Sequence, residues 1–337
     1  MVHMLAAGSF FFNGGIFQDL SQPLLWFLAI SFATPLILAS TGGTISERSG
    51  VVNIAMEGMM LVGAFFSAYT VDQIVNLAHL PAWAGTLFGV LGAVAAGCLI
   101  AGLHAIACVR FRANQVIVGM AINLFALGLT SYLYFTIYPN GTPGSLPGIP
   151  PLHIPAIHFS WSIVHLNLGS LSDLRFMSLG YILFQQNPIV YIAFALVIIA
   201  HVFLFHTTLG LRIRSVGEHP RAADTAGINV QRLRYLAIIL SGGLSGLGGS
   251  YFALNGSGLF SDDMTQGRGF IALAAMIVGK WTPFGATGAC LLFGFGESMS
   301  IILGGNTTIG SYTLSTYMVN MLPYLITIIA VTGIVGR

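Results

Sequence analysis

Two carboxylates interrupt long apolar stretches of this sequence, and charge in such surroundings is the first sign of chemistry. Glu57 and Glu297 lie in runs apolar enough to cross a membrane, where an ionisable group is costly and indicates a functional site. Asn53 precedes Glu57 by four residues, so a helix would place both side chains on one face. Together with Asn123, these residues are predicted to line a pathway for a hydrogen-bonding solute. The alternative is structural: Glu57 caps a broken helix or pairs with a neighbouring one.

Spacing argues against a catalytic or metal-binding histidine. The Gly-x-Ser-Gly pattern that ends at Gly246 is also found in intramembrane serine proteases, which need a histidine base on a later helix. All nine histidines lie at or before His219, so no such base exists. His201 and His206 are five residues apart, roughly 500° around a helix, and do not share a metal-binding face. We therefore expect no catalytic residue and no metal site.

Cysteines and glycines give no further cofactor site. The three cysteines, Cys98, Cys108 and Cys290, are an odd number in apolar stretches, which is neither a disulfide framework nor zinc spacing. The only Gly-Lys pair, at 279–280, is followed by tryptophan rather than Ser or Thr, so the phosphate-binding Walker A pattern is absent. This chain is expected to bind no cofactor, and any ATP-driven work must come from a partner.

Composition places most of the chain in lipid. Of its 337 residues, 55% are hydrophobic and 7% are charged, and the mean hydropathy is +0.86. Soluble domains carry about 25% charged residues, so this chain lacks the groups to cover a water-facing surface. A formal net charge of +2 is too small for a nucleic-acid binder of this size. The sequence predicts an integral membrane protein.

Apolar runs of membrane length predict an all-α, polytopic protein with about nine spans, within a range of eight to ten. The seventh is doubtful, because eleven residues separate Arg268 from Lys280, or about 16 Å of helix. It is either a short helix or a re-entrant one. We expect one transmembrane domain over residues 1–337. The predicted spans are Leu24–Thr41, Val51–Val71, Trp83–Cys108, Gln115–Tyr138, Pro188–His206, Tyr235–Gly256, Gly269–Trp281, Phe284–Leu303 and Thr313–Val335.

Basic residues orient these spans. With nine alternating spans, ten of the twelve Lys and Arg residues fall on one side and only Arg175 and Arg268 on the other. The positive-inside rule then predicts an external N-terminus and a cytoplasmic C-terminus. Residues 139–187 form an external loop with six prolines in 139–155, and residues 207–234 form a cytoplasmic loop with five of the twelve basic residues. That inner loop is either a solvated connector or a docking surface.

The inner loop contains the pattern of one short helix. Pro220 favours a helix start, Ala222 and Ala223 continue it, and Gly227 favours a stop. Small residues four apart follow within the next span, at Ser241–Gly249, and such spacing lets neighbouring helices approach closely.

Three segments resemble the permease subunits of ABC importers that handle branched-chain amino acids, simple sugars and nucleosides. The inner loop matches that family's Glu-x-x-x-Ala-Ala-x-x-x-Gly pattern from Glu218 to Gly227, followed by a Ser-Gly-rich helix. Residues 33–60, which include the Asn-Ile-Ala-Met-Glu stretch from Asn53 to Glu57, are similar to the nucleoside-type subgroup. Residues 269–285 also fit. The matches extend over most of the chain between Ala33 and Leu303.

The resemblance implies a type II-like importer fold, a bacterial plasma (inner) membrane location and a set of partners. ABC ATPase subunits would use ATP and Mg²⁺ and would contact a coupling helix in the inner loop. A periplasmic or lipid-anchored solute-binding protein would deliver the solute, and a second permease subunit would complete the path, with a heterodimer favoured over a homodimer. Nucleosides are the expected solute, before simple sugars and branched-chain amino acids. The residues implied at the ATPase contact are Glu218, Arg221, Ala222, Ala223 and Gly227.

The competing class is an ion-coupled secondary transporter that acts alone. It predicts that neutralising Glu57 or Glu297 abolishes uptake, whereas enlarging Ala222 or Ala223 matters little. The importer hypothesis predicts the reverse order.

Overall fold

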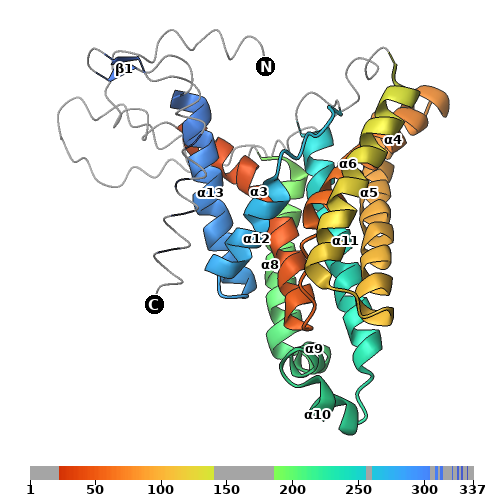
Figure 1. Cartoon of the computed structure of the whole chain (residues 1–337). Helices are drawn as coiled ribbons and strands as arrows, with labels where there is room; N and C mark the ends of the chain where they lie inside the picture. The colour runs from red at the N-terminus through yellow and green to blue at the C-terminus, as the bar shows by residue number, and fades with distance from the viewer. Residues whose placement is uncertain are drawn as a thin grey trace.

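The computed structural model describes residues 23–139, 186–255 and 260–303, together with 308–309, 312–313, 321, 325, 328 and 332. This part of the chain is almost entirely helical, as predicted (Figure 1). Residues 308–309 and 312–313 form a two-residue antiparallel ladder, β1 and β2. Most of the predicted external loop 139–187 lies outside the described residues. The helices are α3 (Pro23–Arg48), α4 (Met56–Asp72), η2 (Gln73–Leu77), α5 (Ala82–Ala105), η3 (Ile106–Arg110), α6 (Gln115–Ile137), α8 (Pro188–His206), α9 (Thr208–Glu218), α10 (Pro220–Thr225), α11 (Val230–Leu254), α12 (Arg268–Val278) and α13 (Pro283–Leu303).

Membrane-length helices account for most of the predicted spans. Seven of the described helices are long and apolar enough to cross a membrane, and they correspond to seven predicted spans. α12 corresponds to the doubtful seventh; with 11 residues, about 16 Å, it is too short to cross alone. The ninth predicted span, Thr313–Val335, lies almost entirely outside the described residues. The polytopic helical class is confirmed and the count of nine is not.

Asparagine caps fix the start of three helices. Asn114 accepts hydrogen bonds from the amides of Val116 and Ile117 at the start of α6. Asn187 does the same for α8, where Pro188 occupies the first helical position, and Asn229 does so for α11. These side chains satisfy amides that have no partner within their own helix.

Burial divides the helices into a core and an outer layer. In α3, α4 and α11, 67% of the membrane-length stretch is buried, compared with 22% in α6 and 33% in α8. The outer layer instead exposes large apolar side chains such as Leu99 on α5, Leu124 on α6 and Ile199 on α8. Such a surface suits lipid rather than water.

Small residues bring α11 into backbone contact with its neighbours, as their spacing predicts. A Cβ atom added at Gly242 would lie 2.5 Å from the carbonyl oxygen of Gly97 on α5. One added at Gly249 would lie 2.0 Å from the carbonyl oxygen of Met60 on α4. Larger side chains cannot occupy these positions without separating the helices.

Positive charge gathers at the end of the bundle that carries α9 and α10, the lower end in Figure 1. The basic residues there end or follow α3, η3 and α12, or lie in α9, α10 and the start of α11. This asymmetry agrees with the predicted charge bias, and the orientation across the membrane stays a prediction. These residues are Arg48, Arg110, Arg112, Arg212, Arg214, Arg221, Arg232, Arg234 and Lys280.

Candidate functional site

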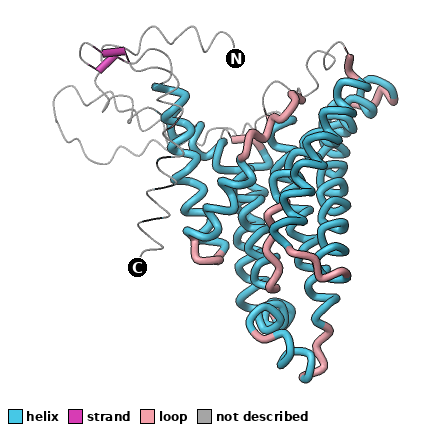
Figure 2. Tube along the Cα trace, viewed as in Figure 1, coloured by secondary structure: helices cyan, strands magenta, loops and turns pink. Residues whose placement is uncertain are grey.

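α4 begins inside the bundle, after the non-helical segment Val51–Ala55 (Figure 2). The predicted span Val51–Val71 therefore starts five residues too early. Asn53 lies before the helix, so its predicted sharing of a helix face with Glu57 is wrong. The Asn53 amide instead donates a hydrogen bond of 2.8 Å to Ser241 Oγ on α11. Its Oδ1 atom has no hydrogen-bond partner among the described residues.

Asn123 caps the start of α4 from a neighbouring helix. Its Oδ1 atom accepts a hydrogen bond of 2.8 Å from the Gly58 amide, and its Nδ2 atom donates one of 3.0 Å to the Ile54 carbonyl. The side chain thus satisfies one group on each side of the helix start, which would otherwise be costly at this depth.

Glu57 caps a second helix that begins inside the bundle, α12. Its Oε1 atom accepts hydrogen bonds from Thr265 Oγ1 at 2.6 Å and from the Gly267 amide at 2.8 Å, and its Oε2 atom accepts one from the Gly269 amide. A carboxylate at a helix N-terminus satisfies unpaired amides and is favoured by the helix dipole. Gly269 makes this contact possible, because a Cβ atom there would lie 2.5 Å from the Glu57 Cα atom. The geometry is that of the structural alternative for Glu57, so neutralising Glu57 is expected to harm an importer as well and does not distinguish it from a secondary transporter.

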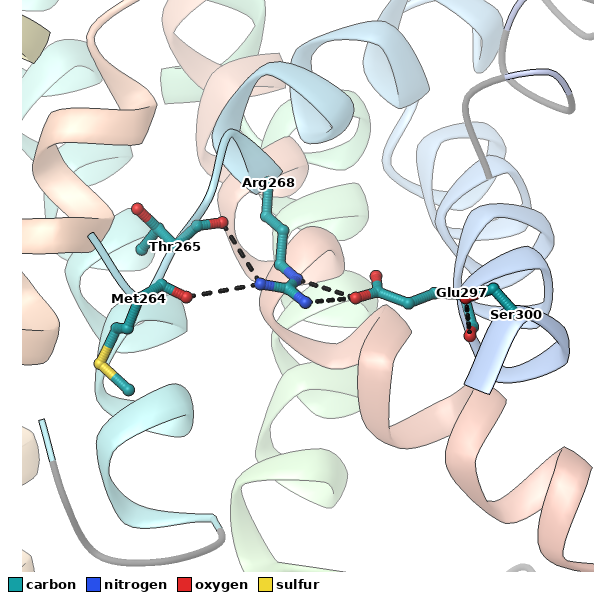
Figure 3. A network of polar contacts seen from close by, with 5 residues as sticks. All are labelled: Met264, Thr265, Arg268, Glu297 and Ser300. Atoms are coloured by element: carbon teal, nitrogen blue, oxygen red, sulfur yellow. Dashed lines mark hydrogen bonds and ion pairs between the residues drawn. The ribbon is translucent and has the colours of Figure 1, made fainter. Parts of the chain in front are cut away.

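Glu297 forms an ion pair with Arg268, the first residue of α12 (Figure 3). Arg268 also donates to the Met264 and Thr265 carbonyls at 3.4 and 3.5 Å, and its guanidinium lies 5.2 Å from the Phe252 ring centroid. The charge pattern of the sequence placed Arg268 in an external loop and did not predict this pairing. The two side chains retain exposed fractions of 18% and 14%.

The predicted pathway residues thus separate into two groups. Asn53, Glu57 and Asn123 surround the helix starts of α4 and α12, and each bonds to backbone or to a neighbouring helix. Glu297 lies apart from them, on α13, beside Arg268. A role in lining the pathway stays a prediction for all four.

At the basic end, the inner loop forms two helices rather than the one predicted. α10 is the predicted short helix: Pro220 occupies its first turn, and Gly227, with φ of 80°, ends it. The amide of Ile228 bonds to the Ala223 carbonyl and that of Gly227 to the Asp224 carbonyl, which is a Schellman cap. α9, an 11-residue helix before it, was not predicted.

The two alanines predicted at a docking contact point in different directions. Ala222 is exposed, whereas Ala223 is only 5% exposed and packs against this chain. Glu218, Arg221 and Gly227 are exposed with Ala222. The free face of α10 therefore presents charged side chains around one small residue, which permits close approach of a partner.

α9 is joined to the bundle at the end of α3. A Cβ atom at Gly217 would lie 2.3 Å from the Arg48 carbonyl oxygen, so α9 touches this backbone directly. Arg48 Nε donates a hydrogen bond of 3.0 Å to the Trp281 carbonyl, in the turn between α12 and α13. Trp281 Nε1 in turn donates to Glu47. This junction could not be predicted from the sequence, because no motif links residues more than 160 positions apart.

The described helices define a polytopic membrane protein with helices that begin inside the bundle and a short exposed helix at its basic end. Residues 26–331 match the family model described as branched-chain amino acid transport system / permease component, and the chain belongs to this family. It is therefore an ABC transporter permease subunit.

The relatives of this chain include guanosine and nucleoside permeases. The chain is 43% identical to the guanosine ABC transporter permease protein NupQ of Bacillus subtilis, over 91% of this chain and 90% of NupQ. It is 38% identical to the nucleoside ABC transporter permease protein NupC of Lactococcus lactis subsp. cremoris, over the same shares of the two chains. A second Bacillus subtilis protein, the guanosine ABC transporter permease protein NupP, is 28% identical over 77% of this chain and 69% of NupP.

Proposed function

We propose that this chain is one permease subunit of an ATP-driven importer that moves nucleosides across a bacterial plasma membrane by alternating access. The observation that carries the substrate class is the similarity to NupQ and NupC over nine-tenths of each protein. Simple sugars and branched-chain amino acids are the alternative solutes for the same architecture.

Partner ATPases supply the driving force in this proposal and bind ATP with Mg²⁺, since this chain carries no Walker A pattern. They contact the exposed surface of α10 and its flanking residues, formed by Glu218, Arg221, Ala222 and Gly227. Ala223 contributes to this contact indirectly, because its buried methyl group packs α10 against the rest of its own chain. Movement of α10 then passes to α9.

The contacts at Gly217 support a rigid link from α9 to the two helices that begin inside the bundle. α9 touches the Arg48 backbone, and the Arg48 side chain binds the turn after α12. The same chain segment continues through Val51–Ala55 to Glu57, which holds the other end of α12. A displacement of α9 therefore acts on α12 at both of its ends, in the manner of rigid-body switching.

A second, different permease completes the transporter in this proposal. Bacillus subtilis has two guanosine permease proteins similar to this chain, NupQ at 43% identity and NupP at 28%. If this chain corresponds to NupQ, a protein that corresponds to NupP would form a heterodimer with it. A periplasmic or lipid-anchored binding protein would dock at the end opposite α10, with the N-terminus external and the C-terminus cytoplasmic.

Co-purification followed by reconstitution tests this function. A tagged chain, extracted from its native membrane, should bring down an ATPase subunit and a second permease. The reconstituted complex with its binding protein should then import radiolabelled nucleosides only with ATP. Transport by the chain alone under an ion gradient, without an ATPase, would establish the secondary transporter instead, and ATP-driven uptake of a sugar or amino acid but no nucleoside would replace the substrate.

The two neighbouring alanines offer a sharper test of the docking face. Ala222→Trp should reduce co-purified ATPase at least tenfold while the permease stays folded, because the new side chain projects from the exposed face. Ala223→Trp should lower the thermal stability of the permease itself, because its side chain enters the contact between α10 and its own chain. Full ATPase retention by Ala222→Trp would rule out this face.

A further inference from the structure

We propose that Gln266, Arg268 and Glu297 lie on the face of this chain that lines the water-filled translocation path, where they contact the nucleoside as it passes. This inference rests on the proposed function and identifies which part of the subunit meets the solute. The opposite wall of the path would belong to the second permease.

The first observation is a stretch of non-helical backbone before α12. Residues 260–267 lead into a helix whose first residues contact Glu57, close to the buried start of α4. Irregular backbone at membrane depth is tolerated only where it is buried in protein or lines an aqueous cavity. Glu57 and Thr265 satisfy the side of this segment that faces the bundle.

The second observation is what the segment exposes on its free side. Gln266 is exposed, as are Ser261, Asp262 and Asp263 before it. The Arg268–Glu297 pair beside it is partly exposed as well, at 18% and 14%. Glu297 lies five residues inside the end of its membrane-length helix, about 7.5 Å in. Charged groups within a membrane-length helix pair with one another and face the bundle interior or a water-filled cavity rather than lipid, and the exposed part of this pair favours the cavity.

The contrast with the outer layer shows that this polarity is confined to one face. Side chains exposed along the middle of α5, α6 and α8 are apolar, among them Leu91, Leu99, Leu124, Ile198 and Ile199. These helices meet lipid. The face of Gln266, Arg268 and Glu297 would be expelled from lipid and therefore requires water or a partner.

The backbone of this segment is also held in an unusual conformation. Asp263 and Gln266 have φ angles of 51° and 47°, in the left-handed region that non-glycine residues rarely adopt. Such strain persists where surrounding contacts over-determine the backbone and is concentrated at functional sites. Here Glu57 fixes the backbone, so the side chain of Gln266 is presented at a defined place.

The chemistry of the face fits a neutral polar solute. The guanidinium and carboxylate form a pair without net charge, so they offer donors and acceptors without trapping an ion. The Gln266 amide adds one donor group and one acceptor. A nucleoside carries hydroxyl groups and a base edge that form hydrogen bonds with these groups, and none of them requires a charged partner.

Thiol accessibility in the complete reconstituted transporter tests the proposal. The three native cysteines, Cys98, Cys108 and Cys290, are replaced by alanine, and Gln266→Cys is compared with Leu124→Cys as a matched position on a lipid-facing helix. A membrane-impermeant, positively charged methanethiosulfonate reagent reacts with the thiolate, which forms only in water. Gln266→Cys should react at least tenfold faster than Leu124→Cys, and excess nucleoside should slow it several-fold.

The outcomes distinguish a failure of the proposed path from a failure of the proposed substrate. Reaction of Gln266→Cys no faster than that of Leu124→Cys would overturn the proposal, as would rapid reaction without protection in a transporter that imports the nucleoside. Protection by a different imported solute, with none by nucleosides, would keep the path on this face and reject the proposed nucleoside function.

Discussion

Among the described helices, α4 and α12 begin inside the bundle, and the segments that lead into them differ in charge and exposure. Before α4, Val51–Ala55 is held by neutral groups: Gln115 accepts from the Val52 amide, and Asn123 bonds to Ile54 and Gly58. Before α12, residues 260–267 are held by the carboxylate of Glu57 and continue into the Arg268–Glu297 ion pair.

The two segments also differ in the exposure of their side chains. In the first segment, Val51, Asn53 and Ala55 are buried, and the side chain that is exposed, Val52, is apolar. In the second, four polar side chains between Ser261 and Gln266 are exposed. Under the proposed function, the first segment transmits movement from the contact of α9 with α3, and the second takes part in conduction.

The largest expected effect is at Glu57, where the two segments meet. Glu57→Leu should prevent accumulation of monodisperse protein, because three donors around α12 lose their acceptor. Glu57→Gln offers one acceptor oxygen and should lower the melting temperature measurably, since each hydrogen bond to a charged group contributes about 1.5–3 kcal/mol. Size-exclusion profiles and thermal unfolding in detergent measure both variants.

Asn123→Ala is the matched change at the first segment. It removes one donor and one acceptor from neutral bonds, at about 1–3 kcal/mol, and should lower the melting temperature less than Glu57→Gln. A larger fall in melting temperature for Asn123→Ala than for Glu57→Gln would contradict the predicted order of the two segments.

The next effect tests the mechanical part of the first segment. Gly217→Ala places a Cβ atom against the Arg48 carbonyl and should separate α9 from α3. Uptake should fall about tenfold while ATP hydrolysis by the complex persists, because the ATPases no longer move the bundle. Gly102→Ala, where a Cβ atom meets nothing within 4 Å, is the control. Equal loss of hydrolysis and uptake would mean that Gly217 acts in assembly rather than coupling.

A smaller effect is expected at the Arg268–Glu297 ion pair, and it distinguishes a structural role from a role in conduction. Arg268→Gln and Glu297→Gln each leave one charge without its partner, and both should lower stability and uptake. The double variant should recover the melting temperature, because no lone charge remains, but should keep uptake about threefold below normal. Full recovery of uptake would assign the pair to structure alone. Thermal unfolding and initial uptake rates at several nucleoside concentrations distinguish these results.

Local patterns were sufficient to predict α10 and the close helix contacts. Pro220 and Gly227 favour the start and stop of a short helix by their backbone chemistry, and small residues four apart, at Gly242 and Gly246, let a neighbouring helix approach closely. Which side of α10 packs against the rest of the chain could not be predicted, because the helix is short and Ala222 and Ala223 are adjacent.

The breaks inside the bundle could not be predicted, for a physical reason. Residues 51–60 form an unbroken, mostly apolar run without proline, which reads as a helix by periodicity alone. Their non-helical start depends on Asn123 and Ser241, which lie far along the chain. Glu57 likewise meets its donors more than 200 residues later, so sequence reasoning identified the carboxylate but not its partners.

A cryo-electron microscopy map of the complete transporter, with both permeases and both ATPases, tests the central claim most directly. The account predicts that Gln266 and the Arg268–Glu297 pair face the axis between the two permeases, while α5, α6 and α8 face the lipid or detergent belt. A map in which Gln266 and the pair are covered by lipid, or in which another face of this chain borders the axis, would contradict it.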